Sequence, residues 1–227
     1  MAVKYPRLPD ARRWHASGHA RGFTLIEMIV AISILALVAV LGWRGLDSIV
    51  RARVALTAEL EQTRGMQLTF AQLQSDTAQL APTALVGARP ALAVTPDSLL
   101  MMRMVHADQQ PTRLQVVSYR LRNGVLTRQE SSSTRDLIAL DALWQAAVSD
   151  IDSAPAAMQP VVLQDDIVSM QMRVWDKRGQ VWLSATSAAP ASADAVAASA
   201  NWSGLEMALQ LRGREGRVVK TFFLGAA

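Results

Sequence analysis

Phe23–Trp43 reads FTLIEMIVAISILALVAVLGW, an apolar run of 21 residues in which Glu27 is the only charged side chain. An α-helix rises about 1.5 Å per residue, so this run can cross the hydrocarbon core of a bilayer, which is about 30 Å thick. A carboxylate inside such a span is costly to desolvate and should have a dedicated partner. The run therefore predicts a membrane-spanning helix with a polar site close to its N-terminal end.

The residues before this run are basic. They include Lys4, Arg7, Arg12, Arg13 and Arg21 but only one acid, Asp10. An excess of Lys and Arg before a span favours a cytoplasmic N-terminus, which places the residues after the span in the periplasm. Without residues 1–22 the chain keeps 18 basic and 18 acidic residues, so its formal net charge falls from +4 to zero. The basic excess is therefore no sign of nucleic-acid binding.

The junction between these two segments, Arg21–Glu27 or RGFTLIE, resembles the processing site of type IV prepilins and of the pseudopilins of type II secretion. In that family a membrane aspartic peptidase cleaves after the glycine and then N-methylates the new first residue. The resemblance implies cleavage between Gly22 and Phe23, methylation of the Phe23 amine, and Glu27 as the fifth residue of the mature chain. Glu27 of one subunit would then neutralise the N-terminal amine of its neighbour inside a filament.

Two other interpretations of the apolar run fit less well. A secretory signal peptide is cut after its apolar region at small residues, and residues 36–42 offer only a poor site of that kind. A plain signal anchor would not need Glu27. A glycine before the scissile bond is also what a peptidase at a membrane surface would favour, because glycine has no side chain.

Helical periodicity continues beyond the apolar run. Apolar residues recur at spacings of three and four as far as Leu80, and no proline occurs between Pro9 and Pro82. We therefore predict one helix from about Thr24 to Leu80, with residues 44–81 as its periplasmic continuation. The alternative is two helices joined near Gly65, because glycine costs about 1 kcal/mol relative to alanine inside a helix.

From Leu92 onward the hydrophobic period changes to two, which is typical of strands. Three hairpins are predicted over residues 117–126, 168–185 and 205–224, with turns at 123–124, 176–179 and 213–216. Residues 136–148 form a candidate short helix, and the Ala/Ser-rich residues 186–200 are expected to be an exposed loop. The fold class is thus α+β and pilin-like, with a long N-terminal helix packed on antiparallel hairpins and residues 82–227 as a periplasmic β-rich domain.

Beyond the processing motif, the chain is similar to the J-type minor pseudopilins of type II secretion, themselves similar to the W-type minor pilins. The segments that carry this similarity are Trp43–Asp47 with Arg51–Arg53, Phe70–Leu80 with Asp76, Tyr119–Arg128, Val168–Trp182 and Gly204–Leu224. The similarity covers most of the chain that would follow the leader, in order.

The similarity implies a subunit that joins I- and K-type partners at the tip of a pseudopilus in a Gram-negative bacterium. That complex is thought to prime assembly for the export of folded proteins across the outer membrane. The implied partners are the prepilin peptidase, other pseudopilins, the inner membrane, secreted substrates and the secretin. The alternative is a minor pilin of a type IV pilus, acting in assembly, adhesion or DNA uptake. For DNA uptake, the only candidate basic cluster is Arg212, Arg214, Arg217 and Lys220.

The sequence gives no support for an enzyme or a cofactor. His106 is the only histidine after the leader, and no zinc-binding His pair, nucleophile elbow or phosphate-binding loop is present. The absence of cysteine excludes thiol chemistry and Cys-based zinc sites. Asp150 with Asp152, and Asp165 with Asp166, are interpreted as solvated charges beside strands rather than as metal ligands. We expect no metal and no nucleic-acid partner.

The large apolar side chains have two possible roles. Four tryptophans, Trp144, Trp175, Trp182 and Trp202, either fill the sheet core or form an aromatic interface, and the core is the favoured interpretation for most of them. Trp43 is expected at the membrane–water boundary. The methionines at 101, 102, 104, 170, 172 and 207 are expected to fill the core.

Overall fold

The computed structural model describes residues 22–149, 159–185 and 200–225. The chain divides into two compact units, residues 1–56 and residues 57–227. The helix α1, Leu25–Ala78, begins in the first unit and ends in the second. This confirms the predicted helix to within two residues at each end, and the alternative of two helices joined near Gly65 is wrong. The predicted leader except Gly22, and most of the Ala/Ser-rich stretch, lie outside the described residues.

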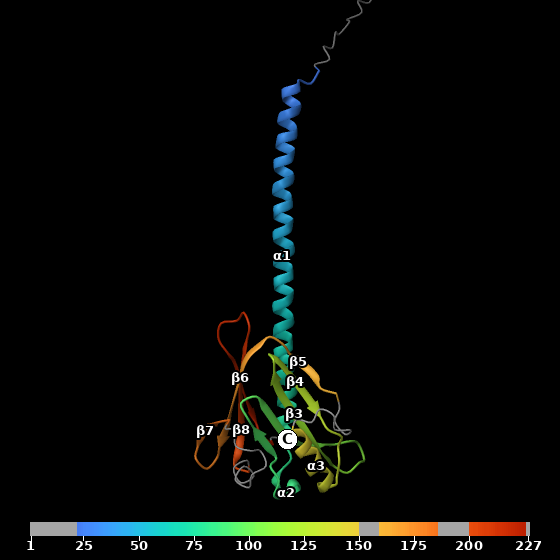
Figure 1. The fold of residues 1–227 in the computed structure, drawn as a ribbon, viewed down its shortest axis with the longest axis vertical. Coiled ribbons are helices and arrows are strands. Elements are labelled where there is room, and N and C mark those ends of the chain that lie inside the picture. The colour runs from blue at the N-terminus through green and yellow to red at the C-terminus, as the bar shows by residue number, and fades with distance from the viewer. Residues whose placement is uncertain (1–21, 150–158, 186–199, 226–227) are drawn as a thin grey trace, which may run out of the picture. The chain divides into compact units, whose positions relative to one another are not determined.

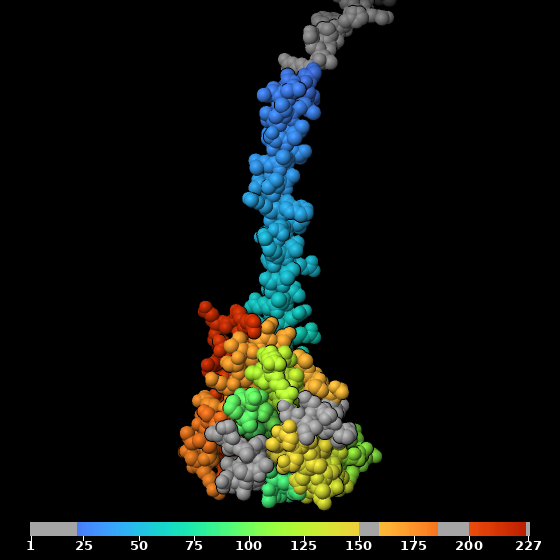
Figure 2. All heavy atoms as spheres, in the orientation of Figure 1, coloured from blue at the N-terminus to red at the C-terminus, as the bar shows by residue number. Residues whose placement is uncertain are grey.

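In the first unit, the described residues form the N-terminal part of α1. Every side chain from Leu25 to Leu56 is exposed, as Figure 2 shows for this stretch in blue. Among the described residues, α1 is the one helix long and apolar enough to cross a membrane, with a mean hydropathy of 2.7 over its most apolar window. Exposed apolar side chains of this density need a non-aqueous environment or other helices around them.

The second unit contains two antiparallel sheets (Figure 1). The first has the strand order β1-β2-β3-β4-β5, and the second has the order β7-β6-β8-β9. The strands of the first sheet are β1 Leu92–Val94, β2 Ser98–Val105, β3 Arg113–Arg122, β4 Val125–Glu130 and β5 Val161–Gln164. Those of the second are β6 Ile167–Asp176, β7 Val181–Ser184, β8 Trp202–Leu211 and β9 Val218–Phe223. A short helix α2, Thr83–Val86, follows α1, and α3, Leu137–Val148, follows β4.

All three predicted hairpins are confirmed. β3 pairs with β4, β6 with β7, and β8 with β9. In the tightest of them Arg122 pairs with Val125, and the two turn residues Asn123 and Gly124 have φ angles of 50° and 79°. This backbone is the left-handed one that an Asn-Gly turn adopts at little cost. The predicted short helix is confirmed as α3, whose N-cap Asp136 accepts a hydrogen bond from Ile138 N at 2.9 Å.

The C-terminal part of α1 packs between the two sheets. Its side chains Met66, Phe70 and Leu73 share one core with inward-facing residues of both sheets. Toward the second sheet, the Phe70 and Phe222 ring centroids are 6.1 Å apart. Toward the first sheet, α1 contacts β3 and β4 through Asp76. The opposite face of the first sheet is covered by α3, which buries Leu140 and Trp144 against β2 and β3.

The six methionines singled out above and two of the four tryptophans lie in the core or pack against it. Five of the six methionines are buried, and Met104 is partly buried. Trp144 is buried, and Trp202 packs against the main core. The expectation of core positions is wrong for Trp175 and Trp182, which are half-buried and contact each other edge to face at 5.4 Å. Strand side chains alternate between faces, so Trp175 lies on the opposite face from its buried neighbour Val174.

Candidate functional site

The residues of the predicted processing motif stand at the start of α1. Leu25 is the first helical residue, so Thr24 is the N-cap and Glu27 is the third residue of the helix. The Glu27 Oε2 atom accepts hydrogen bonds from Thr24 N at 3.2 Å and from Thr24 Oγ1 at 3.1 Å. In return, Glu27 N donates to Thr24 Oγ1 at 3.3 Å. This reciprocal arrangement is a capping box, which satisfies backbone N–H groups that the first helical turn leaves without partners.

The capping box engages only one oxygen of the Glu27 carboxylate. Among the described residues, Oε1 accepts no hydrogen bond. The carboxylate lies at the positive end of the helix dipole, which stabilises a negative charge there. Around it, Ile26, Val30, Ala31 and Ile34 line an open apolar hollow of about 330 Å³. A single acceptor in an apolar surface is suited to one cationic group from outside the chain.

Gly22 and Phe23 precede the helix. The Phe23 side chain is 82% exposed. A Cβ atom added to Gly22 would meet no atom within 4 Å. Packing among the described residues therefore does not require a glycine at position 22.

A second polar site lies inside the second unit, around the fully buried Asp76 of α1. Its Oδ2 accepts from Tyr119 Oη at 2.6 Å and from Arg128 Nε at 2.8 Å, and its Oδ1 accepts from Arg103 Nη1 at 2.7 Å. Glu130 then bridges the two arginines, with its Oε2 at 3.1 Å from Arg103 Nη2 and 2.9 Å from Arg128 Nη1. The two arginines and two acids form a neutral cluster that joins α1 to β2, β3 and β4.

The pKa directions in this cluster follow from burial and from Asp76. Burial and the adjacent Asp76 charge raise the pKa of Tyr119, which therefore remains a neutral hydrogen-bond donor. Burial disfavours the Arg128 charge, but hydrogen bonds and attraction to Asp76 outweigh it and raise the pKa of Arg128. This cluster has the character of a structural contact, because Asp76, Tyr119 and both arginines find their partners within the chain.

The other candidate residues are dispersed. His106 follows β2 and is exposed. Each member of the candidate basic cluster contacts a separate residue of its own chain, namely Arg212 with Asp166, Arg214 with Thr63, Arg217 with Gln171 and Lys220 with Gln74. Asp165 and Asp166 lie between β5 and β6, and Asp150 and Asp152 lie outside the described residues. Within the described ranges, no three His, Cys, Asp or Glu side chains gather in a way that could hold a metal ion.

Sequence reasoning recognised Glu27 but missed Thr24 and the cluster around Asp76. The signal for Thr24 was present, because Thr-x-x-Glu before an apolar run is the pattern of a capping box. The Asp76 cluster had no such signal, since its members are separated by up to 54 residues, from Asp76 to Glu130.

Two family comparisons cover most of the chain. Residues 18–43 match the family described as the prokaryotic N-terminal methylation motif. Residues 44–215 match the family described as type II secretion system (T2SS), protein J. A comparison with curated proteins finds no match.

Proposed function

Because the chain belongs to the type II secretion protein J family, we propose that it acts in the tip complex that primes pseudopilus assembly. The family is one of minor pseudopilins, which are structural subunits and not an enzyme family. The chain also carries the prepilin-type methylation motif and an N-terminal helix apolar enough for single-pass anchoring. Its role would be to promote assembly for the export of folded proteins across the outer membrane.

The observation that carries this proposal is the geometry at the start of α1. The carboxylate of Glu27 keeps one oxygen without a partner in an apolar surface, a few residues after Gly22–Phe23. We infer cleavage between Gly22 and Phe23, methylation of Phe23, and pairing of Glu27 with the N-terminal amine of a neighbouring subunit. In an apolar bundle of helices, pairing of the carboxylate with the amine would offset the desolvation cost of burying either charge alone.

The same proposal assigns the parts of the chain. Residues 1–22 would be a cytoplasmic leader, residues 23–43 the inner-membrane and assembly helix, and residues 44–81 its periplasmic continuation. Residues 82–227 would be the periplasmic β-rich part, with the Ala/Ser-rich loop 186–200. The basic residues of the leader support this orientation.

The test is recovery of partners with the full-length chain. A tagged copy would be extracted from membranes in detergent, together with the I- and K-type pseudopilins encoded in the same gene cluster. Recovery of both partners in one complex is the expected result. Recovery of minor pilins in place of pseudopilins would assign the chain to a type IV pilus, and recovery of neither would contradict the tip role.

A further inference from the structure

The strand β9 forms an open edge of the second sheet. It stands at one end of the strand order β7-β6-β8-β9 and has six residues. The other edge strands described, β1, β5 and β7, have only three or four residues each, and β1 is buried along its whole length. The backbone N–H and C=O groups of an edge strand can pair with a strand from another chain. Among the described edges, β9 is therefore the longest that another strand could join.

The register with β8 determines where the backbone groups of β9 point. Leu224 N donates to Ser203 O at 3.0 Å, and the pairing of β9 with β8 is regular from there to the other end of β9. In an antiparallel pair, alternate residues bond to the same neighbour, so the even-numbered residues of β9 bond to β8. The odd-numbered residues, Val219, Thr221 and Phe223, direct their N–H and C=O groups away from β8. Among the described residues, these six backbone groups have no hydrogen-bond partner.

This edge is not covered by the rest of the second unit. Helix α1 meets the chain only after the strand, where Gly225 N donates to Thr77 O at 3.0 Å. Within the strand, the side chains of Val219 and Phe223 are 53% and 77% exposed, and Thr221 is exposed as well. The outward backbone groups of β9 are therefore open to a partner.

Aromatic side chains extend along the outer face of the sheet up to this edge. The register places Trp182, Trp175, Gly204 and Phe223 in one row across the four strands. A Cβ added to Gly204 would lie 3.2 Å from Trp175 Cβ and 3.4 Å from Trp182 Cη2, so the two tryptophans reach over the glycine. Aromatic side chains contribute strongly to binding when a partner covers them. A strand added beside β9 would place a side chain against Phe223 and continue the row.

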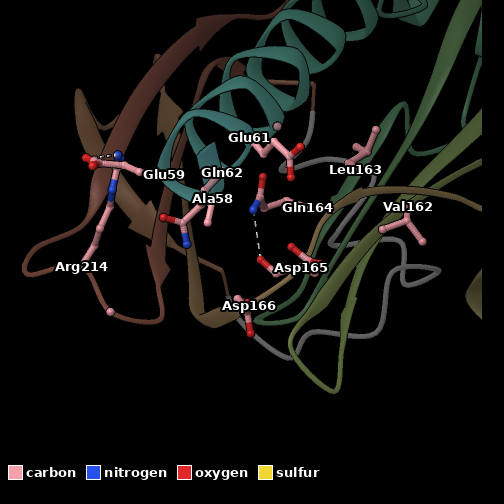
Figure 3. A pocket seen from close by; sticks show the side chains of 12 residues that line it. Ala58, Glu59, Glu61, Gln62, Val162, Leu163, Gln164, Asp165, Asp166 and Arg214 are labelled. Carbon is pink, nitrogen blue, oxygen red and sulfur yellow. Dashed lines mark hydrogen bonds and ion pairs between the residues drawn. The ribbon is translucent and has the colours of Figure 1, made fainter. Parts of the chain in front are cut away.

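The edge and the turn before it are basic. Residues 212–223 contain four basic residues and one acid, although the chain without its leader has no net charge. The bases at 212 and 214 have acidic partners within the chain, and Figure 3 shows Arg214 with Glu59, 3.7 Å apart. Arg217 and Lys220 hydrogen-bond only neutral glutamine side chains. Among the described residues, no acid lies within ion-pair distance of these two.

Unpaired backbone groups, an exposed aromatic side chain and uncompensated positive charge are all satisfied by an extended acidic segment. In strand addition, main-chain hydrogen bonds supply affinity and alternate side chains supply specificity. We propose that an acidic strand of a neighbouring pseudopilin extends the second sheet at β9. Its backbone bonds to Val219, Thr221 and Phe223, and its acidic side chains lie near Arg217 and Lys220, since opposite charges are favourable across strands. This inference rests on the function proposed above and adds a partner surface to it.

The first test is amide hydrogen exchange, resolved by residue, in the full-length chain. The chain alone is compared with the detergent-extracted complex that it forms with the pseudopilins encoded in the same gene cluster. In the chain alone, Lys220 and Phe222 should be protected, whereas Val219, Thr221 and Phe223 should exchange fast because their amides have no acceptor. In the complex, exchange of the last three should slow at least about tenfold. A partner that touches only side chains would leave the alternation unchanged.

A proline in the middle of the edge gives a second test. Thr221→Pro removes one outward N–H and places a ring where the added strand would lie. Proline is tolerated on an edge strand when the missing N–H does not bond to the neighbouring strand. Partner recovery should fall about tenfold, as for the loss of one anchoring contact. Thr221→Val is the matched control, because it keeps the backbone N–H, and it should match the wild type.

The charge of the edge is tested separately. Arg217→Gln should lower partner recovery at low salt, and the difference from the wild type should shrink as salt is raised, because salt screens exposed charge pairs. Arg178→Gln removes an exposed arginine from the turn between β6 and β7 and should match the wild type. Equal recovery of the Arg217→Gln variant at low salt would contradict an acidic partner.

The outcomes separate this inference from the tip role. If the wild type recovers pseudopilins while the three outward amides stay unprotected and Thr221→Pro recovers them equally well, the edge inference is wrong and the tip role stands. If these amides become protected in the chain alone as its concentration rises, the edge binds a second copy and the inference is again wrong. If the wild type recovers no pseudopilin, both proposals are wrong. The exchange measurement needs no substitution, so it decides the inference even if the proline variant fails to fold.

Discussion

A glycine and an acid stand at each end of helix α1, and the two pairs have opposite surroundings. Gly22, just before the helix, is paired with Glu27 in its first turn, and Gly65 is paired with Asp76 near its end. Gly22 has no atom within 4 Å of an added Cβ, whereas a Cβ on Gly65 would lie 2.1 Å from Gln164 Oε1. Glu27 is exposed, and among the described residues its side chain bonds only to Thr24. Asp76 is fully buried and bonds to Tyr119 and Arg128 of two strands of the first sheet and to Arg103 of a third. The fold explains Gly65 and Asp76. Contacts among the described residues do not account for Gly22, and for Glu27 they account only for the helix cap.

The largest effect is expected from Gly22→Leu. If a peptidase selects this position, the bulky side chain should abolish removal of the leader, which mass spectrometry of the recovered chain would show directly. The matched variant Gly45→Leu changes a glycine inside α1 that likewise has nothing within 4 Å of an added Cβ, and it should be processed normally. Efficient cleavage of the Gly22 variant would mean that the start of α1 is not a peptidase site.

Asp76→Ala should have the largest effect on stability. It leaves Arg103 and Arg128 in the core without their main acceptor, and breaking a buried ion pair in this way costs about 3–5 kcal/mol. The free energy of unfolding, measured by chemical denaturation of the detergent-solubilised chain, should fall by that amount. A loss below about 1 kcal/mol would show that the cluster does not hold α1 to the first sheet.

Gly65→Ala should destabilise the second unit although alanine is the better helix former. Alanine gains about 1 kcal/mol of helix propensity, but its Cβ must displace the Gln164 carboxamide, and such overpacking costs about 1–3 kcal/mol. Gly42→Ala is the control, because nothing lies near its added Cβ. A stabilised Gly65→Ala variant would show that Gln164 moves aside at no cost.

Glu27→Gln separates the two roles of that residue. Glutamine can still form a capping box, so the helix start should be retained while the charge is lost. Cleavage should be unchanged, and incorporation into pseudopilus complexes should fall about tenfold, which corresponds to about 1.4 kcal/mol. Thr24→Ala is the reciprocal variant, which removes the cap and keeps the charge. Equal assembly of the Glu27→Gln variant and the wild type would remove the assembly role from this carboxylate.

The smallest effect concerns a partly exposed ion pair between the loop after α2 and α3. Arg89 Nε and Nη2 donate to Asp141 Oδ1 and Oδ2 at 2.6 and 2.8 Å. The hydrogen bond from Arg89 lowers the pKa of Asp141. The pair therefore stabilises the fold fully at pH values above the ordinary aspartate pKa of about 3.9. This stabilisation is lost as the pH falls through the lowered pKa that Asp141 has in the folded chain. Asp141→Asn should therefore cost less than about 1 kcal/mol at neutral pH and nothing in strong acid. Unfolding curves at both pH values would show whether the difference disappears.

The elements that sequence reasoning predicted are those determined by residues close together in the chain. The hairpin at Asn123-Gly124 follows from two turn residues that accept positive φ angles. The length of α1 follows from unbroken periodicity without proline. The processing motif likewise depends on a short stretch, whereas the J-type similarity extends over most of the chain, and family matches support both.

The arrangement of α1 between two sheets was not predictable in the same way. Each face of the helix packs on the sheet with which it buries apolar surface. The apolar surfaces of the two sheets come from strands that are far apart in the sequence. For Trp175 the alternation of β6 already indicated the face of Gln171 and Arg173. Only the pairing of β6 with β7 places Trp182 beside it on that face.

The sequence by itself thus determined the apolar helix, the hairpins with their turns and the motif at Gly22–Glu27, because each depends on local backbone preference or on a short run of consecutive residues. The tertiary structure alone decided that Gly65 accommodates Gln164 and that Asp76 is surrounded by Tyr119, Arg103 and Arg128. These contacts join residues 27 to 99 positions apart, and their free energy exists only once burial has removed water from between them.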